Sequence, residues 1–552
     1  MKKFLLSSLA IFALIGCGGG GSSTSPDEPQ YKTTIKSITI TDDNQIERIN
    51  NSKDATINLS VPDKKDIYVV VTSHFDNQKI SIKSDFAVDS KEHNYKITNK
   101  SNKSYKHTIT PENILKFRED IKEKLKRKTD IKKTVNYKAL ARVTNEDDTR
   151  SFYIDVYDSN YNPTTKKIDA TARKVVKNVS TKYGYKTLVV WVEDDEYNDG
   201  SITSDGIVTQ DMVEKLADTF LKAGSNNDIY DWVTNIYGKE WGDTEYSNLI
   251  EDTGYIDILI DDMEQDGIAG YFYSKDNFKA SAEPSSNEKV MFYINSRLYV
   301  RRGYSEEENE KEILTTLSHE FQHMIHFYQR SVLMDNPHPT WLNELLSETI
   351  EDLVATKIDY KGPRNVDPDD GSAGPSGNTG GRYPAFNRCN TVSLTSWYND
   401  CIDDNGNNLP IDYSKVSAFG AFLTRNHGGA KVMHDIEYSS KSGYQAIEEA
   451  TKTDFKKLLA DWATAVTLSD NSDTSVDIPR YNFGDFKNVT YDNITYKLGS
   501  INFYNYDPQP TFKENETLDS NASLYYHLGE LEGSTSIDIN IPEGADITII
   551  SK

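Results

Sequence analysis

Between residues 33 and 133 the apolar and polar residues follow two different patterns, one typical of strands and one typical of a helix. Residues 33–40 and 66–72 are rich in Ile, Val and Thr, and polar turns separate such stretches. Short runs of this kind predict strands, and several in succession are typical of a β-sandwich. In residues 111–133, Lys and Glu alternate instead. This charge pattern predicts a solvated helix and not a binding surface.

From about residue 146 the pattern changes to strands that alternate with helices. Short apolar runs predict buried strands at residues 188–192, 255–260 and 290–295. Residues 210–223 have helical periodicity. Alternation of this kind is typical of an α/β or α+β body.

A long polar segment and a second set of short strands follow. Residues 359–412 are rich in Gly, Asp, Asn and Pro, and a loop this long in a compact domain is usually functional or disordered. Strands are predicted again at residues 495–498 and 536–541. We therefore expect an α+β multidomain chain, with an N-terminal β-sandwich-like domain that includes the charged helix, a central α+β body and a C-terminal β-domain, at residues 31–145, 146–475 and 476–552.

Length and charge narrow the class of protein. The 552 residues exceed what one core holds, so two to four domains are expected. The net charge of -24 argues against nucleic acid as a partner, because binding nucleic acid needs a basic face.

The first residues resemble an export signal. Lys2 and Lys3 precede an apolar stretch, residues 4–15, that is too short to span a bilayer. It ends in Leu-Ile-Gly before Cys17, which resembles the lipobox of bacterial lipoproteins and implies cleavage after residue 16 and a lipid on Cys17. Residues 17–30 would then form a Gly/Ser-rich tether to a membrane, with the protein in the periplasm or on the cell surface. An ordinary secretory signal is the alternative.

Two further cysteines suit an exported protein. Cys389 and Cys401 form an even pair, which predicts a disulfide bond in an oxidising compartment. Two free buried thiols are the alternative interpretation.

The main candidate for chemistry is the motif His319-Glu320-Phe321-Gln322-His323. Ser305 and Glu308 predict a capping box at the start of its helix. On that helix His319 and His323 share one face and can bind one metal ion, while Glu320 stands at the edge of that face. This is an arrangement in which zinc lowers the pKa of a water and a Glu accepts its proton.

A second predicted helix supplies further carboxylates. Thr340 can cap it after Pro337 and Pro339. Glu344 is the expected third zinc ligand, and Glu348, on the same face, is expected to hold a zinc-binding His ring by its other nitrogen. His326 falls on nearly the face of the two histidines, but it emerges too far along the helix to reach the same ion.

These motifs resemble the gluzincins, the zinc peptidases whose third ligand is a Glu. Within that group the chain is similar to the hyicolysin family of bacterial neutral metallopeptidases over roughly residues 146–470. The resemblance rests on the segments VWVEDD, AGYF, HEFQHMIHFY and TWLNELLSE. It implies a zincin-type catalytic domain with a mixed sheet, an active-site helix, a mostly helical C-terminal subdomain and a cleft between them. The metzincins are excluded, because His326 and Gln329 stand where their motif has Gly and His.

Two other sites are weaker candidates. Tyr413 lies before a helical run and could stabilise the oxyanion, although a packing role is as plausible, and His427 is a weaker alternative. Calcium could bind two acidic clusters, although solvated turns fit them better. The clusters are Asp261-Asp262 with Asp266-Gly267, and Asp403-Asp404 with Asn405-Gly406.

The sequence thus predicts a zinc-dependent endopeptidase with one catalytic ion, held by His319, His323 and Glu344. Its partners would be a protein or peptide substrate, extended beside an edge strand, and a membrane reached through the lipid. The rival hypothesis is a surface-binding lipoprotein with a structural or inactive metal site.

Overall fold

The fold was examined in a computed structural model. It describes the residues in the following ranges: 32–84, 110–126, 143–160, 162–200, 206–265, 267–301, 303–403, 406, 408–510, 512 and 516–552. The expected export signal, Cys17 and the tether lie outside these residues. No helix among the described residues is both long and apolar enough to cross a membrane.

A mixed sheet forms one half of the central body, as the sequence predicted. Its strand order is β5-β6-β7-β8-β10-β9, with β7, β8 and β10 parallel and the other pairs antiparallel. The strands are β5 (Thr149–Tyr157), β6 (Pro163–Thr181), β7 (Gly184–Glu193), β8 (Tyr255–Asp261), β9 (Gly270–Tyr271) and β10 (Met291–Asn295). The three predicted buried strands are β7, β8 and β10. Strand β9 is the edge strand nearest the candidate site.

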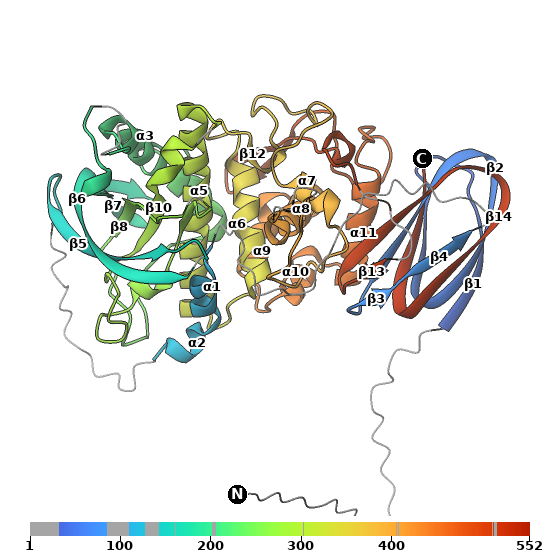
Figure 1. The fold of residues 1–552 in the computed structure, drawn as a ribbon, viewed down its shortest axis with the longest axis horizontal. Helices are drawn as coiled ribbons and strands as arrows, with labels where there is room; N and C mark the ends of the chain where they lie inside the picture. Colours follow the sequence, from blue (N-terminus) through green and yellow to red (C-terminus); the bar gives the residue numbers. More distant parts are fainter. Residues whose placement is uncertain are drawn as a thin grey trace, which may run out of the picture.

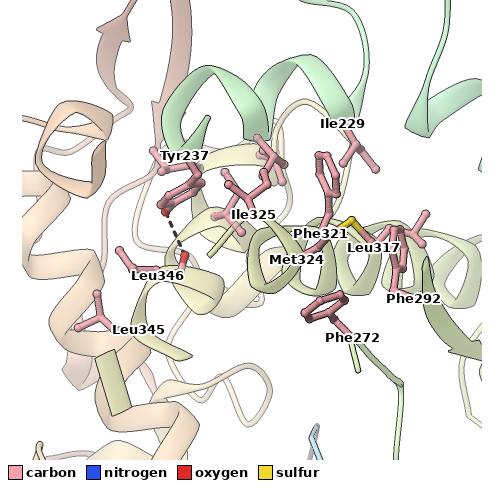
Figure 2. Close-up of a cluster of buried hydrophobic side chains, with 14 of the residues drawn as sticks. Ile229, Tyr237, Phe272, Phe292, Leu317, Phe321, Met324, Ile325, Leu345 and Leu346 are labelled. Carbon is pink, nitrogen blue, oxygen red and sulfur yellow. Dashed lines mark hydrogen bonds between the residues drawn. The ribbon is translucent and has the colours of Figure 1, made fainter. Parts of the chain in front are cut away.

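Helices α3 (Gln210–Phe220), α4 (Ile229–Tyr237) and α5 (Glu306–His326) pack beside this sheet (Figure 1). The predicted capping box starts α5: Ser305 accepts from the Glu308 N–H at 3.2 Å, and Glu308 accepts from the Ser305 N–H at 2.9 Å. Leu317, Phe321 and their apolar neighbours on α5 pack against α4 and the sheet (Figure 2). This buried packing fixes the rotation of α5, and so the direction of its polar motif.

Helices form the other half of the body (Figure 1). They are α6 (Thr340–Val354), α7 (Tyr383–Arg388), α8 (Ile411–Asn426), α9 (Ala430–Glu437), α10 (Tyr444–Thr451) and α11 (Phe455–Thr467). Gly420 lets α8 approach α6, because a Cβ there would lie 2.1 Å from the Thr349 Oγ1. Helix α6 begins at Thr340, but its hydroxyl does not cap the helix as expected and donates to Glu119 at 3.1 Å.

Local contacts hold the described residues of the long segment 359–412. It contains α7, and Cys389 and Cys401 form the predicted disulfide bond. Val392 and Ile411 pack around the bond in a small apolar cluster. The disulfide compensates for a segment with little apolar core of its own.

The β regions expected on both sides of the central body are present, and they join in one composite module (Figure 1, right). Its sheet has the order β1-β2-β14-β4, and β3 and β13 form a separate pair. The strands are β1 (Lys32–Thr39), β2 (Ile46–Ser73), β3 (Gln78–Lys79), β4 (Ser81–Ser84), β13 (Thr517–Leu518) and β14 (Ala522–Ser551). The long strands β2 and β14 pair along most of their length and share one apolar core. The paired residues of β2 and β14 lie about 450 to 500 positions apart in the sequence, so local patterns cannot show that the two strands belong together.

The remaining strands of the expected C-terminal domain belong to the central body. Hairpin β11 (Lys487–Tyr491) and β12 (Ile494–Leu498) packs on its helices. The Tyr496 hydroxyl donates to the Trp232 carbonyl in α4 at 2.8 Å. This hairpin, which the sequence places in the C-terminal domain, therefore packs on the central body.

The charged segment near residue 111 also departs from expectation. It forms α1 (Glu112–Glu119) and α2 (Ile121–Lys124), which pack on the central body between the sheet and α6 (Figure 1). Ile114, Phe117 and Ile121 are buried. Their spacing forms an apolar stripe, which the alternating charges of the neighbours conceal in the sequence.

Candidate metal centre

Helix α5 holds His319 and His323 side by side. Their ring centroids lie 4.8 Å apart, and both side chains are buried. Glu320, also fully buried, turns toward β9, where its Oε2 accepts a hydrogen bond from the Phe272 N–H at 2.7 Å. Gly270 permits this close approach of β9 to α5, since a Cβ there would lie 3.0 Å from the Thr316 Cγ2 of α5 and 2.6 Å from the Tyr293 carbonyl oxygen of β10. The segment AGYF thus positions the Glu of the motif.

Helix α6 brings Glu344 to the same point. Its Oε2 lies 3.3 Å from the Nε2 of His319 and 3.3 Å from the Nε2 of His323. Two ligand atoms bound to one tetrahedral zinc ion at about 2.0–2.1 Å lie about 3.3 Å apart. The structure therefore brings the three predicted ligands together with a spacing that suits zinc.

The polar atoms at this point fit a cation. Among the described residues, His319 Nε2, Glu320 Oε1 and Glu344 Oε2 are buried without a hydrogen-bond partner. Burying such atoms costs free energy unless something else satisfies them. Two imidazoles and one carboxylate are a donor set typical of catalytic zinc, with one position left open.

The electrostatics of the cluster also suit a cation. Burial alone would raise the pKa of Glu344, but His323, His319 and Arg118 outweigh it and lower that pKa well below its usual value. Burial lowers the pKa of His319, yet Glu344 and Glu351 outweigh it and raise the pKa. The two carboxylates thus attract positive charge to the ring. Burial raises the pKa of Glu320 to about 7, which suits a group that exchanges protons near neutrality.

The carboxylate that orients His319 is Glu351 and not Glu348. Glu351 Oε1 lies 2.7 Å from His319 Nδ1. Glu348 also lies near this ring, but both of its oxygens bind Arg382, in hydrogen bonds of 2.9 and 2.7 Å. Glu351 lies two turns after Glu344, so it returns to nearly the same face and meets the His319 ring, whereas Glu348 is held by Arg382.

The ring of His323 is held by uncharged side chains, those of Asn343 and Ser347. Asn343 Oδ1 lies 3.0 Å from His323 Nδ1, and the Ser347 hydroxyl lies at the same distance. His326 points elsewhere: its Nδ1 pairs with Glu437 Oε2 at 3.0 Å. Its separation from the three-atom cluster agrees with its exclusion as a ligand.

We expect Glu351→Gln to weaken metal binding about 10- to 100-fold, the usual cost of losing an outer carboxylate. The amide keeps the size of the side chain but removes the charge that favours the ligating tautomer of His319. Competition with a chromogenic chelator measures the effect. Glu348→Gln is the matched control and should change affinity less; equal effects of the two variants would contradict the assignment.

Tyr413, at the start of α8, lies close enough to Glu344 for the carboxylate charge to affect its pKa. Burial and the charge of Glu344 raise the pKa of Tyr413. Its hydroxyl accepts a hydrogen bond from the Thr110 N–H at 3.1 Å, which leaves its own proton available. His427 follows the far end of α8, about 20 Å along the helix axis, and is therefore remote.

Calcium has no comparable site in the described part of the chain. The groups of three candidate ligands found there are His319 with His323 and Glu344, and His319 with Glu348 and Glu351, the latter set being engaged by Arg382. Asp262 forms an ion pair with Arg297 at 2.5 Å. Asp266, Asp404 and Asn405 lie outside the described residues.

Sequence reasoning missed several contributors to the site. Glu351 could have been found, because it lies seven residues after Glu344 on the same helix, a spacing that nearly repeats its face. Asn343 directly precedes Glu344, and no helical spacing points to it. Arg382 and Arg118 come from distant segments, and no local pattern points to them. The Phe272 N–H acts through the backbone, so its residue type carries no signal.

Known peptidases are similar to the central part of this chain. The sequence profile of the family "Peptidase M30" matches residues 169–475, which is more than half of the chain. The neutral metalloprotease ShpI of Staphylococcus hyicus is 26% identical over 266 residues, which are 46% of this chain and 52% of that protein. The chain thus spans about half the length of this curated relative. On the extent of the profile match, the chain belongs to the peptidase M30 family.

Proposed function

We propose that the chain is a zinc-dependent endopeptidase, with His319, His323 and Glu344 as the metal ligands. The observation that carries the proposal is the set of three buried ligand atoms, from two helices, at distances that suit tetrahedral zinc. The related metalloprotease and the family add support for peptide hydrolysis. Zinc bound here would polarise the scissile carbonyl and lower the pKa of a water molecule.

The side chains of the site suit the remaining steps. Glu320 accepts the proton of the attacking water on Oε1 and returns it to the leaving amine. The Phe272 N–H holds its other oxygen in place at 2.7 Å. Tyr413 donates to the oxyanion that develops on the carbonyl. The peptide runs extended beside edge strand β9, which offers backbone groups for pairing.

A surface-binding lipoprotein with a structural metal site is the second candidate. Structural zinc sites are closed by four protein ligands. Here three ligand atoms converge, and Glu320 directs an unpartnered oxygen to the same region. This arrangement favours the peptidase.

Metal removal tests the proposal. The purified chain should contain one zinc ion and cleave an unstructured protein such as casein. Chelation should abolish cleavage, and stoichiometric zinc should restore it, because the water cannot be activated without the ion. Zinc-loaded, folded protein with no cleavage above the rate of Glu320→Gln would refute the proposal.

We also propose that the protein is a lipoprotein anchored outside the cytoplasm. The support is the Leu-Ile-Gly-Cys sequence after a short apolar stretch and the Gly/Ser-rich segment that follows. Cys17→Ser should remove the protein from the membrane fraction or block its processing. A variant that remains membrane-bound and correctly cleaved would rule out the lipid.

A further inference from the structure

Helix α1 crosses the candidate metal centre and contacts its key groups. Arg118 Nη1 lies 3.1 Å from Glu344 Oε1, the oxygen that faces away from the histidines. Its Nη2 donates to the Phe272 carbonyl at 3.2 Å, directly after edge strand β9. At the start of the segment, the Thr110 N–H donates to the hydroxyl of Tyr413. One segment therefore engages a metal-ligand candidate, the substrate edge and the oxyanion-donor candidate.

The segment is anchored on both halves of the central body. On the side of the sheet, Asn113 donates to Asp155 at 3.1 Å, and Lys124 pairs with Glu283 at 3.0 Å. On the side of the helices, Glu119 accepts from Thr340 in α6. Residues 110–126 thus bridge the two halves at the place where a peptide must enter.

Apolar contacts add to these polar anchors. Phe117 packs edge-on against Tyr273, with ring centroids 5.2 Å apart, and against Phe278 at 5.9 Å. Ile114, Leu115 and Ile121 are fully buried. The aromatic face just beyond β9 is therefore covered by this segment.

Cavities adjoin the segment on two sides. One, of about 350 Å³, lies between Arg118, Ile121 and the metal-site residue His323. The other, of about 310 Å³, lies between Thr110, Leu115 and Tyr413. The same segment therefore lines a cavity on each of its two sides, next to His323 and next to Tyr413.

We propose that residues 110–126 are an inhibitory segment that occupies the substrate groove and must move before a peptide can be cleaved. The inference rests on the proposed peptidase function. Arg118 blocks the groove in two ways: its guanidinium takes the Phe272 carbonyl that an extended peptide would use, and its positive charge beside Glu344 competes with a cation. The segment therefore lowers both peptide affinity and metal affinity.

Peptide binding tests the inference without catalysis. In a Glu320→Gln background, Arg118→Ala should bind a fluorescent peptide about ten-fold more tightly, the scale of one lost charge-assisted hydrogen bond. Phe117→Ala, which loosens α1 without touching the metal site, should act in the same direction. Lys122→Ala is the control, since Lys122 is an exposed cation of α2 outside the described contacts. Thermal unfolding checks that each variant is folded.

The same variants with Glu320 restored separate this inference from the proposed function. A rise of about ten-fold in kcat/KM, together with tighter zinc binding in Arg118→Ala, supports both. Tighter peptide and zinc binding with no cleavage in any variant would leave the inhibitory segment standing and refute the peptidase. Arg118→Ala and Phe117→Ala that bind peptide and zinc no better than Lys122→Ala, in an enzyme that cleaves, would overturn the inference. Lower activity and weaker zinc binding in Arg118→Ala would likewise overturn it, because they would make Arg118 a support of Glu344.

Discussion

Glu320→Gln is expected to retain the metal and to cleave peptides about 10²- to 10⁴-fold more slowly. Glu320 is absent from the three ligand atoms that converge, so the metal does not depend on it. The amide can still accept from the Phe272 N–H, which keeps the side chain in place. It cannot take a proton, and proton transfer is the step we assign to Oε1.

Steady-state cleavage rates and the zinc content of the same sample measure this effect. Glu320→Asp is the matched comparison, because it keeps the charge but withdraws the carboxylate by one methylene. It should lose part of the activity. A Glu320→Gln protein that cleaves at the normal rate would remove Glu320 from the mechanism.

Glu344→Ala is expected to weaken zinc binding by more than about 100-fold, beyond the usual effect of an outer residue, and to abolish cleavage. The variant removes one of three ligand atoms, and the two rings that remain lie on a single helix. It also leaves Arg118 without its carboxylate partner, which adds positive charge near the histidines. Chelator competition and activity assays measure the two effects.

His326→Ala is the control for Glu344→Ala. His326 is buried and pairs with Glu437, so its loss should lower the free energy of unfolding by about 1–3 kcal/mol. It should not change the zinc content. Loss of zinc in His326→Ala, with zinc retained in Glu344→Ala, would show that the third ligand is wrongly assigned.

The sequence was most informative where one helix carries the pattern. The capping box and the apolar spacing of α5 place His319 and His323 on one face, and the structure has both where expected. The outer carboxylate was predicted on the right helix but at the wrong residue. Positions four and seven residues after Glu344 both lie near its face, and only the packing of α6 against α5 decides that Glu351 meets His319.

Contacts between distant segments could not be predicted in this way. Strands β12 and β14 have similar local patterns, yet β12 joins the central body and β14 joins the module of β1 and β2. What separates them is their long-range contacts: Tyr496 of β12 binds the Trp232 carbonyl of α4, whereas β14 pairs with β2. In α1 the many charged residues concealed the apolar stripe, so the sequence predicted a solvated helix. The structure instead packs α1 on the central body, where Arg118 contacts Glu344.

The composite β-module has a consequence for synthesis of the protein. Strand β2 emerges from the ribosome early, but its neighbour β14 is complete only at residue 551. The central body can fold first, as an insertion between the two halves, while β2 keeps an open edge along 28 residues. Such an edge is a template for pairing with other chains. Translation that stops before residue 522 should therefore yield a folded central body that carries β2 unpaired. Such a product should aggregate, even though it lacks only the strand β14.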